Sequence, residues 1–252
     1  MNDSPFVPYR PKRWSEPEMK ARAASFYAEL DGRRSVRHFA VDPVPRELIE
    51  WAIRTASTAP SGAHRQPWTF VAISDPAIKH QIRVAAEHEE RLSYEGGRMP
   101  ADWKRALAPL GTDWRKPFLQ IVPWIVVVFE QTHGVDNDGH NRKNYYTKES
   151  VGIACGLFIA ALHQNGALDA HTHTQSDGFP LRSVGAPSHE RPFILFPIGY
   201  PAVDAQVPNL SRKARTRSRC GTHRLRRPPT WGSIRGRLAN APRSDPWPSS
   251  SS

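Results

Sequence analysis

Apolar residues occur in two patterns along this chain, one with helical spacing and one in short runs. After Pro45 they recur every three or four residues as far as Ala56, which predicts one buried face of a helix. Trp68–Ser74 and Trp124–Glu130 are instead largely apolar throughout, as buried strands are. The alternation of helices with apolar strands predicts an α/β or α+β layer architecture.

Capping and breaking residues mark the ends of the predicted elements. Ser15-Glu16-Pro17-Glu18 has the form of a capping box, with proline in the first helical turn, where it is tolerated. Small residues within 148–165 allow another helix to approach closely, so we expect this helix at the centre of the domain or at a subunit contact. The pattern predicts helices over residues 16–30, 45–56, 76–94, 101–116 and 148–165, strands over 68–74, 124–130, 168–174 and 193–198, and a polar loop over 134–144.

The two ends of the chain differ in composition from its body. Residues 1–14 predict an arm rich in proline and arginine, and residues 15–213 predict a single domain. Residues 214–252 hold nine arginines and one acid, so they carry +8 of the formal charge of +11 and leave the body nearly balanced. They show no helical or strand period, which predicts disorder. A nucleic-acid or acidic partner is one interpretation of this tail, but we favour a non-native sequence, as a frameshift or readthrough produces.

Several classes of protein are excluded by what the sequence lacks. Its two cysteines are too few for a disulfide framework or a cysteine-based zinc site. The longest apolar stretch, Val151–Leu162, is too short to cross a bilayer, and the N-terminus has no signal-peptide core, so we expect a cytoplasmic protein without a membrane partner. Rossmann, P-loop, α/β-hydrolase and zincin motifs are absent. His171 and His173 share a strand face, but no third metal ligand lies nearby, so we expect no metal site.

Cationic side chains that could bind an anion are concentrated in Arg33-Arg34-Ser35-Val36-Arg37. Arginine binds phosphate through a planar fork, often with two hydrogen bonds. Taken alone, this segment is better interpreted as a solvated basic turn. Two distant segments support binding: the loop Thr58–Trp68, whose small residues let backbone amides approach a flat ligand, and Arg212 near the end of the body.

Three motifs together resemble a known family. R-R-S-V-R at 33–37, T-A-P-S-G-A-H-x-x-P-W at 58–68 and G-Y-P at 199–201 are similar to the FMN-dependent nitroreductase superfamily, and more narrowly to its iodotyrosine deiodinase branch. The resemblance runs from about Trp14 to Lys213. It implies a nitroreductase-like mixed β-sheet flanked by helices, in a domain-exchanged homodimer with FMN at the interface.

The resemblance also implies which residues bind the cofactor. Arg33, Arg34 and Ser35 match positions that hold the FMN phosphate and ribityl chain, and Arg37 matches one close to the flavin ring. A cation there stabilises the negative charge of reduced flavin. The remaining cofactor-binding positions implied are Pro60, Ser61 and Gly62 against the flavin, Arg212 at the phosphate, and Thr172, His173 and Thr174 at the flavin edge.

Within the last group, Thr174 is implied to be the catalytic residue, because its hydroxyl matches a hydrogen-bond donor to flavin N5. Thr172 supports it, and His173 stands where the family usually has threonine. Donation to N5 favours one-electron steps, which suit reductive removal of an aryl halide.

Glu90, Tyr94 and Lys116 select the deiodinase branch, in which the matching residues form a lid over an amino acid. Glu90 and Tyr94 are four apart, so on a helix they project from one face. Lys116 can pair with an α-carboxylate and Glu90 with an α-ammonium, while Tyr94 adds a hydrogen bond and a wall. The Ala63 backbone N–H matches the donor to the substrate phenolate. The alternative for Glu90 is a solvated helix charge.

The resulting expectation is an FMN-dependent reductive dehalogenase of halotyrosines, with NAD(P)H or a partner reductase as electron donor. One alternative is a general nitroreductase or quinone reductase acting on nitroaromatics. Another is an inactive product or a basic-tailed binding protein. Nucleic-acid binding by the body is not supported, since the positive charge lies in the tail.

Overall fold

The computed structural model describes residues 6–136, 138–166, 168–169 and 186–213. The chain divides into two compact units, residues 1–208 and 209–252, and the second is described only over 209–213, as irregular backbone. No described helix is long and apolar enough to span a membrane. The helical elements are α1 (Glu16–Gly32), α2 (Arg46–Ala56), η1 (Gly62–His64), α3 (Pro76–Tyr94), α4 (Ala101–Leu107), η2 (Ala108–Leu110), α5 (Phe118–Ile121) and α6 (Thr147–Gln164). The strands are β1 (Trp68–Ile73), β2 (Trp124–Gln131), β3 (His133–Val135), β4 (Asn141–Lys143), β5 (Leu168–Asp169) and β6 (Glu190–Gly199).

Four strands form the main sheet, in the order β1-β2-β6-β5. β2 lies between β1 and β6, so that Val126 is opposite both Ala72 and Phe196. We expected a mixed sheet, whereas every described strand pair is antiparallel. The chain passes from β1 through α3, α4 and α5 to β2, which pairs with β1 in the antiparallel direction. The α/β layer architecture itself is confirmed.

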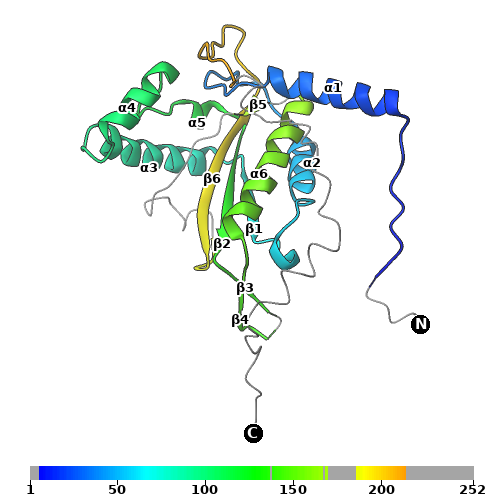
Figure 1. Ribbon diagram of the computed structural model, residues 1–252. Helices are drawn as coiled ribbons and strands as arrows, with labels where there is room; N and C mark the ends of the chain where they lie inside the picture. Colours follow the sequence, from blue (N-terminus) through cyan, green and yellow to red (C-terminus); the bar gives the residue numbers. More distant parts are fainter. Residues whose placement is uncertain (1–5, 137, 167, 170–185, 214–252) are drawn as a thin grey trace, which may run out of the picture. The chain divides into compact units, whose positions relative to one another are not determined.

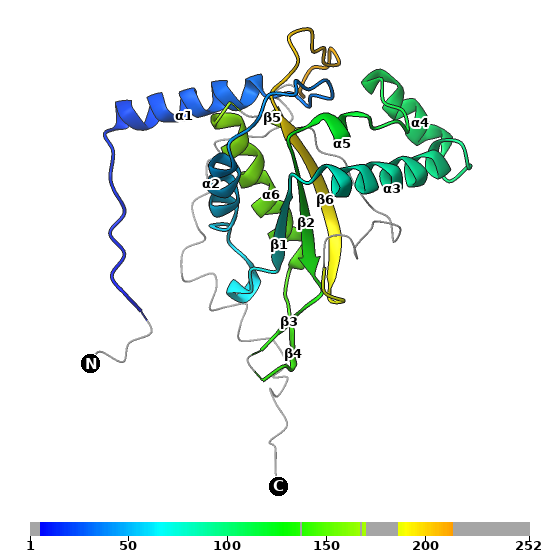
Figure 2. The same cartoon turned by 180° about the vertical axis from the view of Figure 1, so that it is seen from behind.

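The central strand β2 separates two hydrophobic cores, because its side chains alternate between the faces of the sheet. Val126 and Val128 belong to the core that α2 and α6 cover, and Ile125, Val127 and Phe129 belong to the core under α3 and α5 (Figures 1 and 2). All five are fully buried. Since burying such a side chain contributes about 1.5–3 kcal/mol, both faces of this strand stabilise the fold, which explains its unbroken apolar run.

Two predicted elements differ from the structure. The helix predicted over residues 101–116 is divided into α4 and η2 and ends before Gly111, which has a φ of +60°. Proline at 109 and 117 removes backbone donors, and this glycine turns the chain out of the helix. The polar loop predicted over 134–144 contains the β3–β4 hairpin. Its strands are polar and three residues long, so they leave no hydrophobic pattern.

Parts of α1 and α6 carry apolar or small residues that remain exposed in the described chain. Ser15 caps the N-terminus of α1 as predicted, and its Oγ accepts the Glu18 N–H at 3.4 Å. The helix nevertheless buries none of its 17 residues, and Phe26 is 51% exposed. In α6, a Cβ added at Gly152 or Gly156 meets no atom within 4 Å. α6 packs on α2 and the sheet, which confirms its central place, whereas its role in a subunit contact stays a prediction.

Candidate functional site

The arginine-rich turn follows α1 directly and is held at one end of the sheet. Val36 is buried in the core under α3, and Phe39 forms a β-bridge to Pro201, just beyond the end of β6. The Arg34 guanidinium donates a hydrogen bond to the carbonyl oxygen of Pro208. These contacts bring the R-R-S-V-R and G-Y-P motifs together, although they are more than 160 residues apart.

Arg37 supplies a positive charge that no carboxylate of the described residues pairs with. Like Arg33, Arg34 and Ser35, it is half-buried. Within the described part of the chain Arg37 makes no hydrogen bond or ion pair. Burial lowers the pKa of its guanidinium, and a Coulombic interaction with Tyr94 opposes this effect. Because arginine stays protonated even so, the turn suits an anionic group.

The loop after α2, which carries Pro60, Ser61 and Gly62, is fixed against the start of α6. A Cβ at Gly62 would lie 2.4 Å from the carbonyl oxygen of Tyr145, so only glycine permits this approach. The Gly62 N–H donates to Ser150 Oγ at 3.3 Å, and the Gln66 N–H donates to Ser61 Oγ at 2.9 Å. The position of the loop is therefore set by contacts within itself and with α6.

The same loop holds three non-glycine residues in an uncommon backbone conformation. Ala63, His64 and Gln66 have φ values of +50°, +54° and +48°. Such conformations are sterically costly and concentrate where a ligand or substrate is bound. Ala63, the predicted donor to the substrate phenolate, is exposed at the loop surface.

This loop and the arginine turn lie at opposite ends of the sheet. β1 and β6 run in the same direction, since both are antiparallel to β2. The loop precedes the start of β1, where Thr69 donates to Glu190 at the start of β6, whereas the arginine turn lies beyond the end of β6. At about 3.3 Å per residue, the ten residues of β6 separate the two regions by roughly 30 Å.

The three predicted lid residues are brought together by α3 and the segment that precedes α5. Lys116 Nζ lies 3.4 Å from Glu90 Oε2, with side-chain exposures of 8% and 27%. The same ammonium lies 5.9 Å from the centre of the Tyr94 ring and donates to the carbonyl oxygen of Asp113. The Tyr94 hydroxyl lies 3.1 Å from Thr112 Oγ1. Tyr94 also has a Coulombic interaction with Arg37, so the lid lies within electrostatic range of the arginine turn.

Four predicted site residues are not placed against these groups. Thr172, His173 and Thr174 lie outside the described residues, as does the histidine pair that includes His171. Arg212 belongs to the second unit, which is described separately. Their roles, like the domain limits at 14/15 and 213/214, stay predictions.

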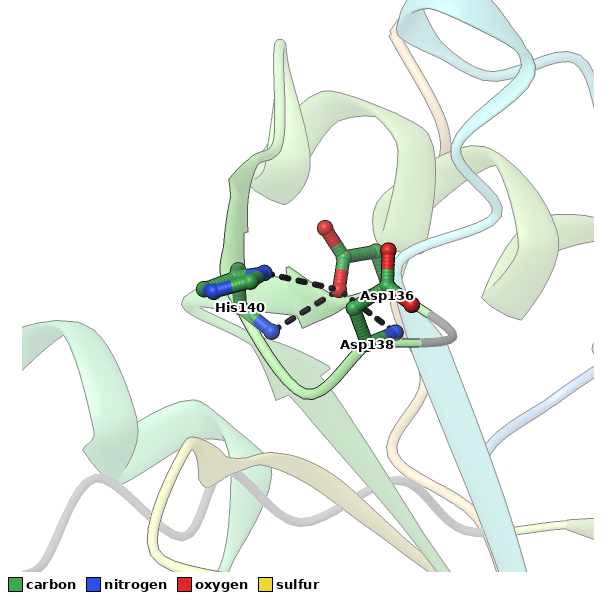
Figure 3. A group of neighbouring side chains, drawn as sticks. All are labelled: Asp136, Asp138 and His140. Carbon is green, nitrogen blue, oxygen red and sulfur yellow. Dashed lines mark hydrogen bonds and ion pairs between the residues drawn. The ribbon is translucent and has the colours of Figure 1, made fainter.

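Two other sets of potentially reactive side chains have structural roles that require no ligand. Asp136, Asp138 and His140 lie around the turn between β3 and β4, with possible ligand atoms within 4.8 Å of one another (Figure 3). Asp136 Oδ1 accepts the backbone N–H of Asp138 and of His140 at 3.1 and 2.8 Å, so this carboxylate closes the turn. Burial raises the pKa of the Cys155 thiol to about 12, which keeps it protonated and a poor nucleophile.

Sequence reasoning missed the residues that support the lid. Glu87 accepts the backbone N–H of Lys116 at 2.8 Å, and Thr112 meets Tyr94. Glu87 could have been found from its spacing, because it precedes Glu90 by three residues on the same helix face. No sequence signal indicated Thr112.

Comparisons with known proteins give similarity to one family of enzymes. The model of the Nitroreductase family matches residues 30–200. Iodotyrosine deiodinase from Haliscomenobacter hydrossis is 53% identical over 209 residues, which cover 82% of this chain and 93% of that protein. Iodotyrosine deiodinase from Hydra vulgaris is 46% identical over 210 residues, which cover 82% and 76%. A crystal structure of oxidized iodotyrosine deiodinase bound to FMN and 3-iodo-L-tyrosine matches with a TM-score of 0.66 and 28% identity, covering 75% of this chain and 96% of that one.

Proposed function

The chain belongs to the nitroreductase family, and on that premise we propose that it is an FMN-dependent enzyme that removes halogen reductively from halotyrosines. The expected resemblance to the iodotyrosine deiodinase branch is thus confirmed by its relatives. The observation that carries the proposal is the contact of Glu90, Tyr94 and Lys116.

These lid residues suit the backbone of an amino acid. Lys116 and Glu90 carry opposite charges, are adjacent, and are largely shielded from water. A zwitterion can exchange their single ion pair for two, with its carboxylate on Lys116 and its ammonium on Glu90. Tyr94 supplies a hydrogen bond and a wall. A ligand that lacks the zwitterion leaves both charges paired only with each other, which gives the site its selectivity.

The arginine turn suits the cofactor. Arg33, Arg34 and Ser35 would hold the phosphate and ribityl chain of FMN, and Arg37 would lie near its ring, where its charge balances a reduced, anionic flavin. The fit rests on the donors themselves, above all the half-buried Arg37 that no described carboxylate neutralises. FMN, when bound and reduced, would supply the two electrons that, with one proton, replace the carbon–halogen bond by a carbon–hydrogen bond and release halide. NAD(P)H is the proposed ultimate electron donor.

The remaining cofactor contacts complete the same proposal. Thr174 would donate to flavin N5 as the catalytic residue, with Thr172 and His173 at the flavin edge. Arg212 would join the first arginines at the phosphate.

The site is proposed to require two copies of the chain in a homodimer. Pro60, Ser61, Gly62 and Ala63 lie at the opposite end of the sheet from the arginine turn, so one flavin cannot contact both within a chain. A second copy brings its loop to the first copy's turn and lid. The exposed side of α1 and the open glycines of α6 supply apolar and closely approachable surface for such an interface.

Flavin fluorescence tests this function against its alternatives. We expect the purified protein to be yellow, and 3-iodo-L-tyrosine to quench its flavin fluorescence with saturation. A general nitroreductase would turn over nitroaromatics and show no response to iodotyrosine. A colourless protein whose DNA binding falls steeply with salt would instead support the tail-driven alternative.

A further inference from the structure

Two residues four apart on α3 hold the segment from Lys116 to Val122 against this helix. Lys79 Nζ donates to the carbonyl oxygen of Val122 at 2.7 Å, and its side chain is buried. One turn later, Arg83 Nη1 donates to the side chain of Gln120 at 3.0 Å. The segment therefore runs antiparallel to α3, with one contact per helical turn.

Glu87 continues this series and reaches the backbone of a lid residue. Its Oε1 accepts the Lys116 N–H at 2.8 Å and Arg83 Nε at 2.9 Å, and its side chain is 18% exposed. One turn further along, Glu90 meets the Lys116 ammonium at 3.4 Å. The backbone and the side chain of Lys116 are thus held by successive turns of the same helix.

We infer that Glu87 is a positioning residue for the amino-acid clamp. Its carboxylate anchors the Lys116 backbone to α3, so that the ammonium lies beside Glu90 and Tyr94, and it does not itself contact substrate. A lysine side chain on an unanchored loop would lose much more conformational freedom on binding a carboxylate. This inference rests on the proposed binding of a zwitterion by Glu90 and Lys116.

The test compares two ligands on flavin-loaded variants by fluorescence quenching. 3-Iodo-L-tyrosine carries the zwitterion, and 2-iodophenol does not. We expect Glu87→Ala to weaken iodotyrosine binding by about tenfold, as loss of a charge-assisted hydrogen bond does, with iodophenol affinity and flavin content unchanged. Glu87→Gln, which keeps an acceptor oxygen, should restore most of the affinity. Glu89→Ala removes another carboxylate of α3, which pairs with Arg98 beyond the end of the helix, and this variant should match the wild type.

Each outcome supports or overturns the positioning role of Glu87. It is overturned if Glu87→Ala binds iodotyrosine as the wild type does, if both ligands weaken equally, or if Glu87→Gln is as weak as Glu87→Ala. If Glu87→Ala loses flavin, Glu87→Asp is tested instead, because its shorter side chain keeps the charge but cannot reach the Lys116 N–H. A selective loss of iodotyrosine affinity in Glu87→Asp supports the inference, and unchanged iodotyrosine affinity overturns it. Absence of iodotyrosine binding by the wild type would refute the clamp itself, a different failure.

Discussion

The lid and the arginine turn are adjacent, yet their charges are balanced in different ways. In the lid, the buried Lys116 ammonium is paired with Glu90 and donates to a backbone carbonyl. In the turn, and among the described residues, the Arg34 guanidinium donates to a carbonyl oxygen and has no ion pair, and neither has Arg37. The comparison indicates that Glu90 and Lys116 neutralise each other, whereas Arg37 still offers its charge to an anionic ligand.

The largest effect is expected from breaking the lid pair. Lys116→Ala leaves the Glu90 carboxylate without its cation and removes the partner of the substrate carboxylate, a loss of about 2–5 kcal/mol for a shielded charge pair. Iodotyrosine affinity, measured by flavin fluorescence, should fall at least 30-fold with FMN retained. Lys20→Ala, an exposed lysine on α1, is the matched control. Unchanged halotyrosine affinity in Lys116→Ala would show that the clamp is wrong.

A smaller loss is expected in the turn, and it should affect the other ligand. Arg37→Ala removes a charged donor, which is worth about 1.5–3 kcal/mol, so FMN affinity of the apoprotein should fall by roughly 10- to 150-fold. Arg37→Lys keeps the charge without the planar fork and should lie between the two. The comparison fails if Arg37→Ala binds FMN normally but loses iodotyrosine.

A third prediction concerns the loop that a second copy is proposed to supply. Gly62→Ala places a methyl group 2.4 Å from the Tyr145 carbonyl oxygen, so the backbone must shift, at a cost of about 1–3 kcal/mol. We expect a lower free energy of unfolding in urea and a loss of bound FMN. Gly32→Ala, whose added methyl meets no atom within 4 Å, is the control. Equal stability and flavin content in the two variants would show that the close approach is dispensable.

The smallest effect is expected at the edge of the lid. Thr112→Val removes Thr112 Oγ1 from Tyr94, but the Thr112 carbonyl oxygen remains 3.3 Å from the same hydroxyl. A neutral hydrogen bond contributes about 0.5–1.5 kcal/mol, so iodotyrosine should bind only a few-fold more weakly. A loss as large as that of Lys116→Ala would mean that Tyr94, rather than the ion pair, dominates the clamp.

Regular patterns made most of the fold predictable. α3 spans Pro76–Tyr94 as predicted, because Asp75 and Pro76 mark its start and two glycines, at 96 and 97, follow its end. β2 was equally clear, since both of its faces are buried. The break in the predicted 101–116 helix was missed although Pro109 and Gly111 signal it locally, and the β3–β4 hairpin was missed because its short, polar strands leave no hydrophobic pattern.

The candidate site was predictable only in part. Glu90 and Tyr94 share a helix face by spacing alone, but Lys116 lies 22 residues beyond Tyr94 and was chosen through the family resemblance. Glu87 shares that helix face by spacing, but its contact with the Lys116 backbone depends on the path of the chain between them, which spacing does not encode. For Thr174 and Arg212 the sequence remains the only basis.

Product analysis shows whether this protein removes iodide from iodotyrosine. Flavin-loaded protein is incubated anaerobically with 3-iodo-L-tyrosine and dithionite, and tyrosine and iodide are quantified. We expect tyrosine and iodide to appear in equal amounts, and Lys116→Ala to form far less of each. A flavin-loaded protein that reduces nitroaromatics under the same conditions, yet returns iodotyrosine intact without iodide, would contradict it.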